Sequence, residues 1–164
     1  MYKRILVPLE HSPYDAAILS HVSALARLCG ASLILIHVAD GWAARNISHL
    51  DLRESEEMRE DREYLDQVAT RLEDEGLDVD AILANGDPAR EITAAAEREH
   101  CDLIAMSTHG HRFLSDLLYG SVAESVRHRC MVPVLLVRGT KPGRRSGPVA
   151  AEGEGEGEGE ATLS

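Results

Sequence analysis

Two segments of this chain have residue types and spacing suited to holding a phosphate and a sugar. The first is Ser107-Thr108-His109-Gly110, followed after nine residues by Gly120-Ser121. It comes after the apolar run Asp102–Met106 and before Val122–Val126, which is typical of the first turns of a helix. A loop of small residues between a strand and a helix presents backbone N–H groups at the positive end of the helix dipole, where anions bind. The segment therefore predicts a phosphate site.

The second segment, Pro8-Leu9-Glu10-His11-Ser12, supplies a carboxylate. The two oxygens of a carboxylate accept hydrogen bonds, which suits Glu10 to the hydroxyls of a ribose. A less specific explanation holds for each segment. Glu10 can be a solvated loop acid, and Gly110 and Gly120 can serve only a tight turn and a helix cap.

Several enzyme motifs are absent from the sequence. It contains no G-x-x-x-x-G-K-(S/T), which argues against a P-loop nucleotide hydrolase, and neither G-x-S-x-G nor H-E-x-x-H. No general base stands out beside the first segment, so we predict no catalytic residue and no fast hydrolysis. His109 and His111 flank Gly110 and could contact phosphate or a metal ion, but histidines in such loops are more often surface residues. Arg112 is a candidate counter-charge for phosphate. We assign no metal ligands.

The elements that must position these segments follow from hydrophobic periodicity. Five short apolar runs alternate with helical patterns, and the weak alternation of Leu33–Val38 is typical of a strand buried on both faces. We therefore predict an α/β fold, an open doubly wound five-stranded parallel sheet in a single domain. The predicted strands are Ile5–Leu9, Leu33–Val38, Val79–Ala84, Leu103–Met106 and Val132–Val137.

Helix signals lie between these runs. Ser12 and Pro13 begin one helix that stops at Gly30, a second runs from about Leu52 to Glu75, and Asp87-Pro88 caps a third. Ser121 and Glu124 form a capping box for the last helix. In such a sheet, ligands bind beyond the carboxyl ends of neighbouring strands whose connections go to opposite faces. We expect the segments after the first and fourth strands to meet there.

The amino-acid composition argues against several classes of function. The formal net charge of −11 argues against nucleic acid and against anionic membranes, because few basic residues are available to neutralise phosphates. A small nucleotide can still bind, since backbone N–H groups need no net positive charge. The three cysteines lack metal-binding spacing and are predicted to be reduced, buried side chains. No run is long enough for a signal peptide or a membrane span, so a cytoplasmic location is predicted.

At these residues the chain resembles the universal stress protein family. The resemblance covers nearly the whole domain, from Tyr2–Pro8 through Gly86-Asp87-Pro88 to Pro133–Val137, and only the tail falls outside it. The nucleotide-binding branch of the family has the pattern G-x2-G-x9-G-(S/T). The chain departs from the family at three positions, with Ser107 for the first Gly, Glu10 for Asp and His11 for Gly. The resemblance implies a Rossmann-like fold of the adenine nucleotide alpha-hydrolase type and ATP, with Mg²⁺, as the ligand. The predicted binding residues are Pro8, Leu9, Glu10, Val38, Met106, Ser107, Gly110, His111, Arg112, Gly120, Ser121 and Val122.

In this prediction, Val38 lies against adenine, and Gly110, Gly120 and Ser121 hold the phosphates. The resemblance also implies a homodimer paired through Val132–Val137, acting as a nucleotide-responsive regulatory protein of the stress response. Two alternatives stay open, a slow ATPase or nucleotide hydrolase and a dimeric scaffold that binds no nucleotide. Residues 1–138 are predicted to form the domain, and residues 139–164, basic and then alternating Glu with Gly, a disordered tail.

Overall fold

The computed structural model describes residues 1–40, 51–109 and 117–139, with side chains left aside at 40, 51–55, 57, 109 and 117–121. Its elements alternate between strand and helix, as the sequence predicts. In chain order they are β1 (Arg4–Pro8), α1 (Asp15–Cys29), β2 (Ser32–Asp40), α3 (Asp51–Asp74), β3 (Val79–Gly86), α4 (Pro88–Arg98), β4 (Leu103–His109), α5 (Leu117–Arg129) and β5 (Val134–Gly139).

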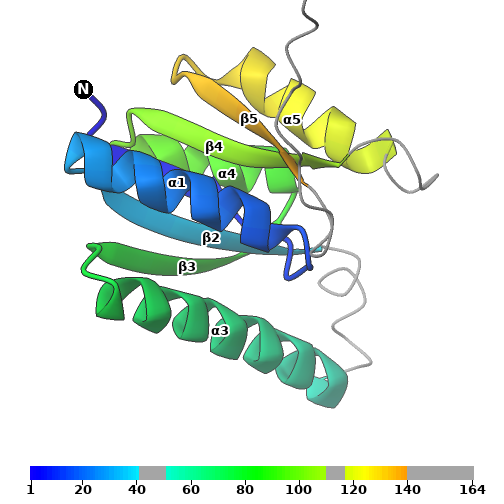
Figure 1. The fold of residues 1–164 in the computed structure, drawn as a ribbon. Coiled ribbons are helices and arrows are strands. Elements are labelled where there is room, and N and C mark those ends of the chain that lie inside the picture. The colour runs from blue at the N-terminus through cyan, green and yellow to red at the C-terminus, as the bar shows by residue number, and fades with distance from the viewer. Residues whose placement is uncertain (41–50, 110–116, 140–164) are drawn as a thin grey trace, which may run out of the picture.

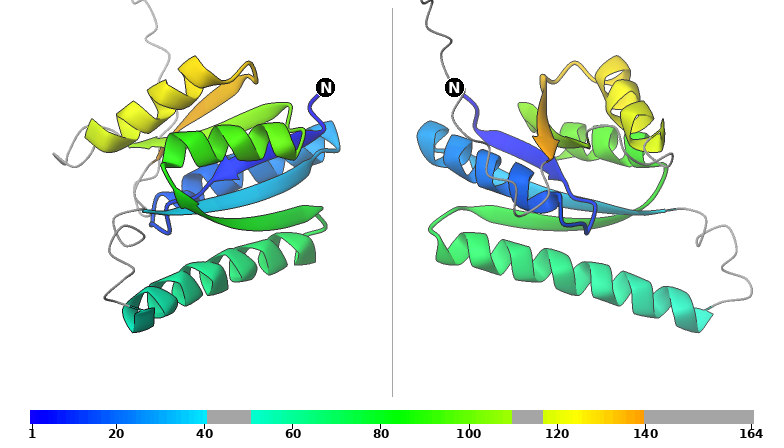
Figure 2. Two further views of the ribbon diagram at one scale, coloured as in Figure 1. Left: turned by 180° about the vertical axis from the view of Figure 1, so that it is seen from behind. Right: turned by 45° about the vertical axis from the view of Figure 1, so that its right-hand side comes forward.

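The five strands form one sheet in the order β3-β2-β1-β4-β5. Each neighbouring pair is parallel, and the central strand β1 pairs with β2 on one side and with β4 on the other. Figure 1 shows α1 in front of this sheet and α4 behind it, and the view from behind in Figure 2 brings α4 forward. The predicted doubly wound α/β fold is therefore confirmed.

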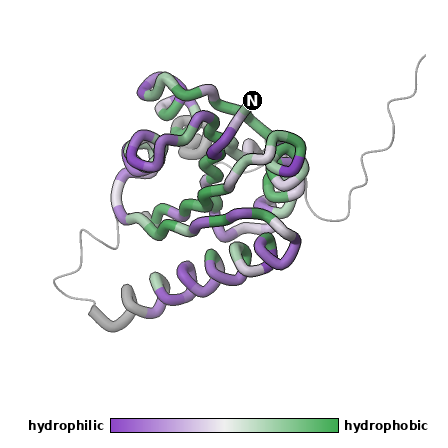
Figure 3. The backbone as a smooth tube through the Cα atoms, turned by 90° about the vertical axis from the view of Figure 1, so that its left-hand side faces the viewer, coloured by the Kyte–Doolittle hydropathy of each residue, from purple (hydrophilic) through white to green (hydrophobic). Residues whose placement is uncertain are grey.

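Two apolar layers hold the helices against the sheet. Ile5, Val7 and Leu35 point into one layer with α1 and α3, whereas Leu6, Ile34 and Ile104 point into the other with α4 and α5. These strand side chains are at most 1% exposed, which explains why the strands are apolar on both faces. Figure 3 shows largely hydrophobic strands beside the mostly hydrophilic α3. The buried residues of α3 recur every three or four positions, as Asp61, Leu65, Val68 and Leu72 do.

Local signals place most element ends correctly. Gly30 ends α1 in the left-handed conformation, with φ 64° and its N–H bonded to the Ala26 carbonyl. The Asp87 side chain caps α4 by accepting a hydrogen bond from the Arg90 N–H at 2.9 Å. The start of α1 is different from the prediction. Ser12 Oγ accepts the Tyr14 N–H at 3.3 Å in a turn, and the helix begins only at Asp15.

Two boundaries around the predicted phosphate segment are wrong. β4 continues through Ser107 and Thr108 to His109 because these residues pair with Val137–Gly139 of β5. Helix α5 begins at Leu117, so Gly120 and Ser121 lie inside it and Ser121 is not its cap. Three good or acceptable helix residues, Leu117, Leu118 and Tyr119, precede the glycine and extend the helix backward.

Several predictions lie outside the described residues. They concern Gly110, His111 and Arg112, and residues 140–164 of the predicted tail. Gly139, its first predicted residue, is the last residue of β5. Within the described part of the chain, no helix has the length and apolar character needed to cross a membrane.

Candidate functional site

The strand order creates a switch point between β1 and β4. These strands are neighbours, with Ile5 opposite Leu103 and Leu6 opposite Ile104. The helix after β1 packs on one face of the sheet, and the helix after β4 packs on the other. Connections that diverge in this way leave a crevice at the carboxyl ends of the two strands, where ligands bind in open α/β sheets. The structure thus brings the carboxyl ends of β1 and β4, and with them the described parts of the two predicted segments, to one edge.

On the α4 and α5 face, this edge is apolar. Met106 is buried, and Val38 and Val122 are half-buried against the same apolar cluster. Three of the predicted binding residues, from two strands and a helix, therefore share one hydrophobic face. Such a surface suits the flat, apolar body of an aromatic base.

The loop between β1 and α1 borders the edge on the other face. Pro8 ends β1, and Leu9 is only 4% exposed and packs into the core with α1 and α3. The Leu9 N–H donates to the Ile36 carbonyl at 2.8 Å, and its own carbonyl lies 2.9 Å from His37 Nδ1. Leu9 is therefore a core residue that anchors the loop. Glu10 is half-buried, and its N–H donates to Asp15 Oδ1 at 3.2 Å.

Asp15, in the first turn of α1, is a buried carboxylate that is not among the predicted binding residues. It is 2% exposed and accepts the N–H of Glu10, the N–H of Ser12 and the hydroxyl of Tyr64, the last at 2.7 Å. Burial raises the pKa of Tyr64 well above its ordinary value, and the hydrogen bond to Asp15 adds to this effect. The phenol therefore stays a hydrogen-bond donor at neutral pH.

Asp61 of α3 is a second buried carboxylate, 7% exposed. Its Oδ1 lies 2.8 Å from His11 Nδ1, and its Oδ2 lies 3.3 Å from His37 Nε2. The sequence analysis did not single out Asp61, although a signal exists. Asp61 stands seven residues before Val68 and four before Leu65, a position where the helical pattern calls for an apolar residue.

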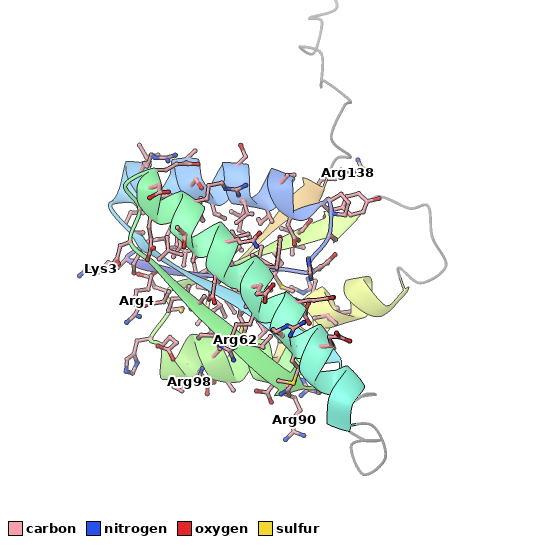
Figure 4. The ribbon with its side chains drawn as sticks, turned by 90° about the horizontal axis from the view of Figure 1, so that it is seen from below. Lys3, Arg4, Arg62, Arg90, Arg98 and Arg138 are labelled. Carbon is pink, nitrogen blue, oxygen red and sulfur yellow. The ribbon has the colours of Figure 1, made fainter. Side chains whose placement is uncertain are left out.

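Ser107 lies in β4 with its side chain toward α1. Its Oγ is buried and has no hydrogen-bond partner among the described residues. A Cβ on Gly139 would stand 3.0 Å from this oxygen and 3.2 Å from Tyr14, so the last residue of β5 packs closely here. In β5, exposed Arg138 pairs in register with Thr108, and Figure 4 shows Arg138 at the opposite end of the molecule from Lys3 and Arg4. It is a cation at this edge that the sequence analysis missed.

The start of α5 determines which amides are available to an anion. The first N–H groups of a helix have no partner within it, and here these include the amides of Leu117, Leu118 and Tyr119. The amides without a partner inside the helix therefore lie up to one turn before Gly120 and Ser121, which occupy the fourth and fifth positions of the helix.

The described residues offer no group of three histidine, cysteine or acidic side chains arranged to hold a metal ion. All three cysteines are free thiols. Cys101 is buried, as predicted, whereas Cys29 and Cys130 are half-buried. Burial raises the pKa of Cys101 from 9.0 to about 11, which keeps this thiol protonated and unreactive at neutral pH.

Comparison with known proteins agrees with this fold. The sequence profile of the universal stress protein family matches residues 1–138. Universal stress protein MJ0577 of Methanocaldococcus jannaschii is 33% identical over 155 residues, which cover 84% of this chain and 96% of that protein. Its solved structure superposes with a TM-score of 0.72 over 85% of this chain and 98% of that one.

Two more distant structures share the fold. A universal stress protein in complex with cAMP is 20% identical with a TM-score of 0.60, and covers 84% of this chain and 97% of that one. A universal stress protein from Archaeoglobus fulgidus in complex with dAMP is 21% identical with a TM-score of 0.62, and covers 82% of this chain and 97% of that one.

The described residues form a doubly wound α/β domain, which defines the class of fold. Within that class, the chain belongs to the universal stress protein family, as the match over residues 1–138 and the similarity to MJ0577 establish. The resemblance seen in the sequence is confirmed.

Proposed function

We propose that this chain binds ATP, with Mg²⁺, at the carboxyl edge where β1 and β4 meet, and acts as a nucleotide-responsive homodimeric regulator in the stress response. The observation that carries the proposal is the divergence of α1 and α5 to opposite faces after these neighbouring strands. Such divergence produces the crevice in which open α/β sheets bind nucleotides. Two universal stress proteins with the same fold were crystallised with the adenine nucleotides cAMP and dAMP, which supports the proposal.

The residues at this edge fit the parts of an adenine nucleotide. Val38 and Met106, on the α4 and α5 face, form an apolar surface for the base. Glu10 supplies acceptors for the ribose hydroxyls. The amides at the start of α5, which have no partner within the helix, and the cation of Arg138 suit the phosphates, whose remaining charge Mg²⁺ would neutralise.

The proposed homodimer rests on β5. This strand is at an edge of the sheet, and Leu136 is 49% exposed on it. An exposed apolar edge strand favours pairing with another strand, and a second copy of β5 is the natural partner. Sedimentation of the purified chain should give the mass of two copies, and Leu136→Lys should shift it toward one. A monomeric unaltered chain would contradict this part of the proposal.

The proposed ligand is tested by acid extraction of freshly purified protein followed by nucleotide chromatography. We expect ATP in the extract at a substantial fraction of the protein concentration. A slow hydrolase would instead convert added ATP to ADP over a time course, and a scaffold would neither contain nor bind nucleotide. The absence of any adenine nucleotide, together with no binding of added ATP, would overturn the proposal.

A substitution in α5 tests the phosphate end of the site. Gly120→Val adds a branched side chain in the first turns of the helix and should abolish ATP binding while leaving the dimer intact. Glu124→Val is the matched control, because it places the same residue on an exposed position of the same helix. Equal ATP affinity in the unaltered chain and in Gly120→Val would contradict the proposed location.

A further inference from the structure

The buried cluster beside the site contains more polar groups than the packing of α3 requires. Asp61 lies on the apolar side of α3 with Leu65 and Val68, which are 2% and 5% exposed. An ionised carboxylate among such neighbours is costly unless it is paired. Its partners are His11, from the β1–α1 loop, and His37, near the carboxyl end of β2.

His37 connects Asp61 to the backbone of the loop. Because the Leu9 carbonyl can only accept a hydrogen bond, Nδ1 of His37 is the donor across their 2.9 Å separation. The other ring nitrogen, Nε2, then faces Asp61 Oδ2 at 3.3 Å. Oxygen atoms on both sides therefore fix the orientation of the His37 ring, which is 13% exposed at its side chain.

The loop is held at four consecutive residues. His37 bonds to the Leu9 carbonyl, and Asp15 accepts the N–H groups of Glu10 and Ser12. Between them, the His11 ring is bonded to Asp61 and stacked on Tyr64, with ring centroids 4.2 Å apart and planes at 15°. Glu10 is thus flanked on both sides by residues tied to buried groups.

The backbone at His11 depends on these contacts. His11 has φ 56°, in the left-handed region that residues other than glycine seldom adopt. A non-glycine residue persists there only where its surroundings hold it. Release of the His11 ring from Asp61 would allow the backbone next to Glu10 to relax toward an ordinary conformation.

We propose that Asp61 is a positioning residue, which acts through His11 and His37 to hold Glu10 where it recognises the ribose of a nucleotide. The α3 helix thereby determines how strongly the site prefers a ribonucleotide over a 2′-deoxyribonucleotide. This inference rests on the proposed nucleotide binding. It adds a residue from α3, far along the chain from both sequence segments, to the control of ligand choice.

The test compares the dissociation constants of ATP and 2′-deoxy-ATP, with Mg²⁺, by titration calorimetry on the full chain. We expect the unaltered protein to prefer ATP. Asp61→Asn should weaken ATP binding about tenfold, as for loss of one good hydrogen bond to a charged group. Binding of 2′-deoxy-ATP should change much less, so the ratio of the two constants should approach one. Asp66→Asn, an exposed position on the same helix, is the matched control.

A second variant guards against a simple loss of folding. His11→Ala removes the link to Asp61 and leaves a non-glycine residue in the left-handed region, so the backbone next to Glu10 should relax. Because His11 is exposed, this variant should remain folded by circular dichroism and still lose the preference for ATP. Glu10→Gln combined with Asp61→Asn should lose no more of that preference than Glu10→Gln alone, because both changes act on the same contact.

The possible results separate two failures. A purely structural role of Asp61 would weaken both nucleotides equally, and this result would overturn the inference. An unchanged ratio in both Asp61→Asn and His11→Ala would also overturn it, as would an unaltered protein that binds the two nucleotides equally. If the unaltered protein binds neither nucleotide, the proposed function itself is wrong, and the inference fails with it.

Discussion

The two faces of the sheet differ at the edge that carries the candidate site. On the α1 and α3 face, two buried carboxylates, two imidazoles and a phenol form a connected network. On the α4 and α5 face, Met106, Val38 and Val122 belong to an apolar cluster. Hydrogen bonds depend on direction and distance, whereas apolar packing depends mainly on volume. One face is therefore suited to fixing a loop, and the other to accepting a flat ligand.

The largest expected effect of a single change is at Asp15. Asp15→Ala removes the acceptor of two backbone N–H groups and of the Tyr64 hydroxyl, and should lower the free energy of unfolding by about 3 kcal/mol. Asp87→Ala, which removes an exposed helix cap, should cost only about 1 kcal/mol. Urea denaturation of both variants measures the difference. Equal losses would mean that the buried network is no more important than a surface cap.

The close packing of Gly139 gives the next largest effect. Gly139→Ala places a Cβ about 3.0 Å from Ser107 Oγ and should cost about 2 kcal/mol through overpacking. Ser107→Ala removes that oxygen and should recover part of the loss in the double variant, while the contact with Tyr14 remains. Thermal unfolding of the two single variants and the double variant measures the coupling, and strict additivity would contradict it.

The dependence of stability on alkaline pH should differ between the two faces, because each face contains an ionisable group whose pKa is raised by burial. The pKa values of Tyr64, on one face, and Cys101, on the other, are both raised by burial. An unfolded chain therefore loses these protons first. Each group contributes its full stability below its unfolded pKa and loses that contribution as pH rises through its folded pKa.

We expect the free energy of unfolding to be level near neutral pH and to fall above the ordinary cysteine value of 9.0, with the Cys101 part complete near 11. Cys101→Ala should reduce the fall in the lower part of this range. Tyr64→Phe should reduce it only above pH 10, the ordinary tyrosine value, and should cost about 1 kcal/mol at neutral pH through the lost bond to Asp15. Denaturant titrations at several pH values measure both changes.

The smallest effect is expected on the apolar face. Met106→Leu keeps the volume and leaves the hydrogen bonds of the other face intact, so it should cost about 1 kcal/mol or less. Binding of ATP should be retained. A loss of stability as large as that of Asp15→Ala would show that the apolar face is as sensitive to substitution as the polar face.

Sequence alone predicts the fold closely because its signals are local. Strands buried on both faces are continuous apolar runs, and Gly30 and Asp87 mark helix ends by their own conformation and side chain. The element boundaries around the phosphate segment are harder to predict from sequence, because β4 is lengthened by pairing with β5, which lies about 30 residues later in the chain. Pairing of this kind depends on the assembled sheet.

The polar network could not be predicted for a related reason. Asp61 is recognisable as an acid in an apolar pattern, but its meaning depends on His11, which lies 50 residues away in the chain. His37 and Tyr64 likewise acquire roles only when β2 and α3 pack together. The predicted binding residues follow from two sequence segments and from the family resemblance. Neither signal reveals residues such as Asp61, which we propose supports the site without contacting the ligand.

The central place of β1 in the sheet also bears on how this chain is made. β1 is synthesised about 100 residues before its neighbour β4, as the hydrogen bonds from the Lys3 and Arg4 N–H groups to the Asp102 carboxylate illustrate. At translation rates of about 5–20 residues per second, one side of the strand waits roughly 5–20 s for its partner. During that time the nascent chain carries an unpaired apolar strand, so chaperone capture early in synthesis is to be expected.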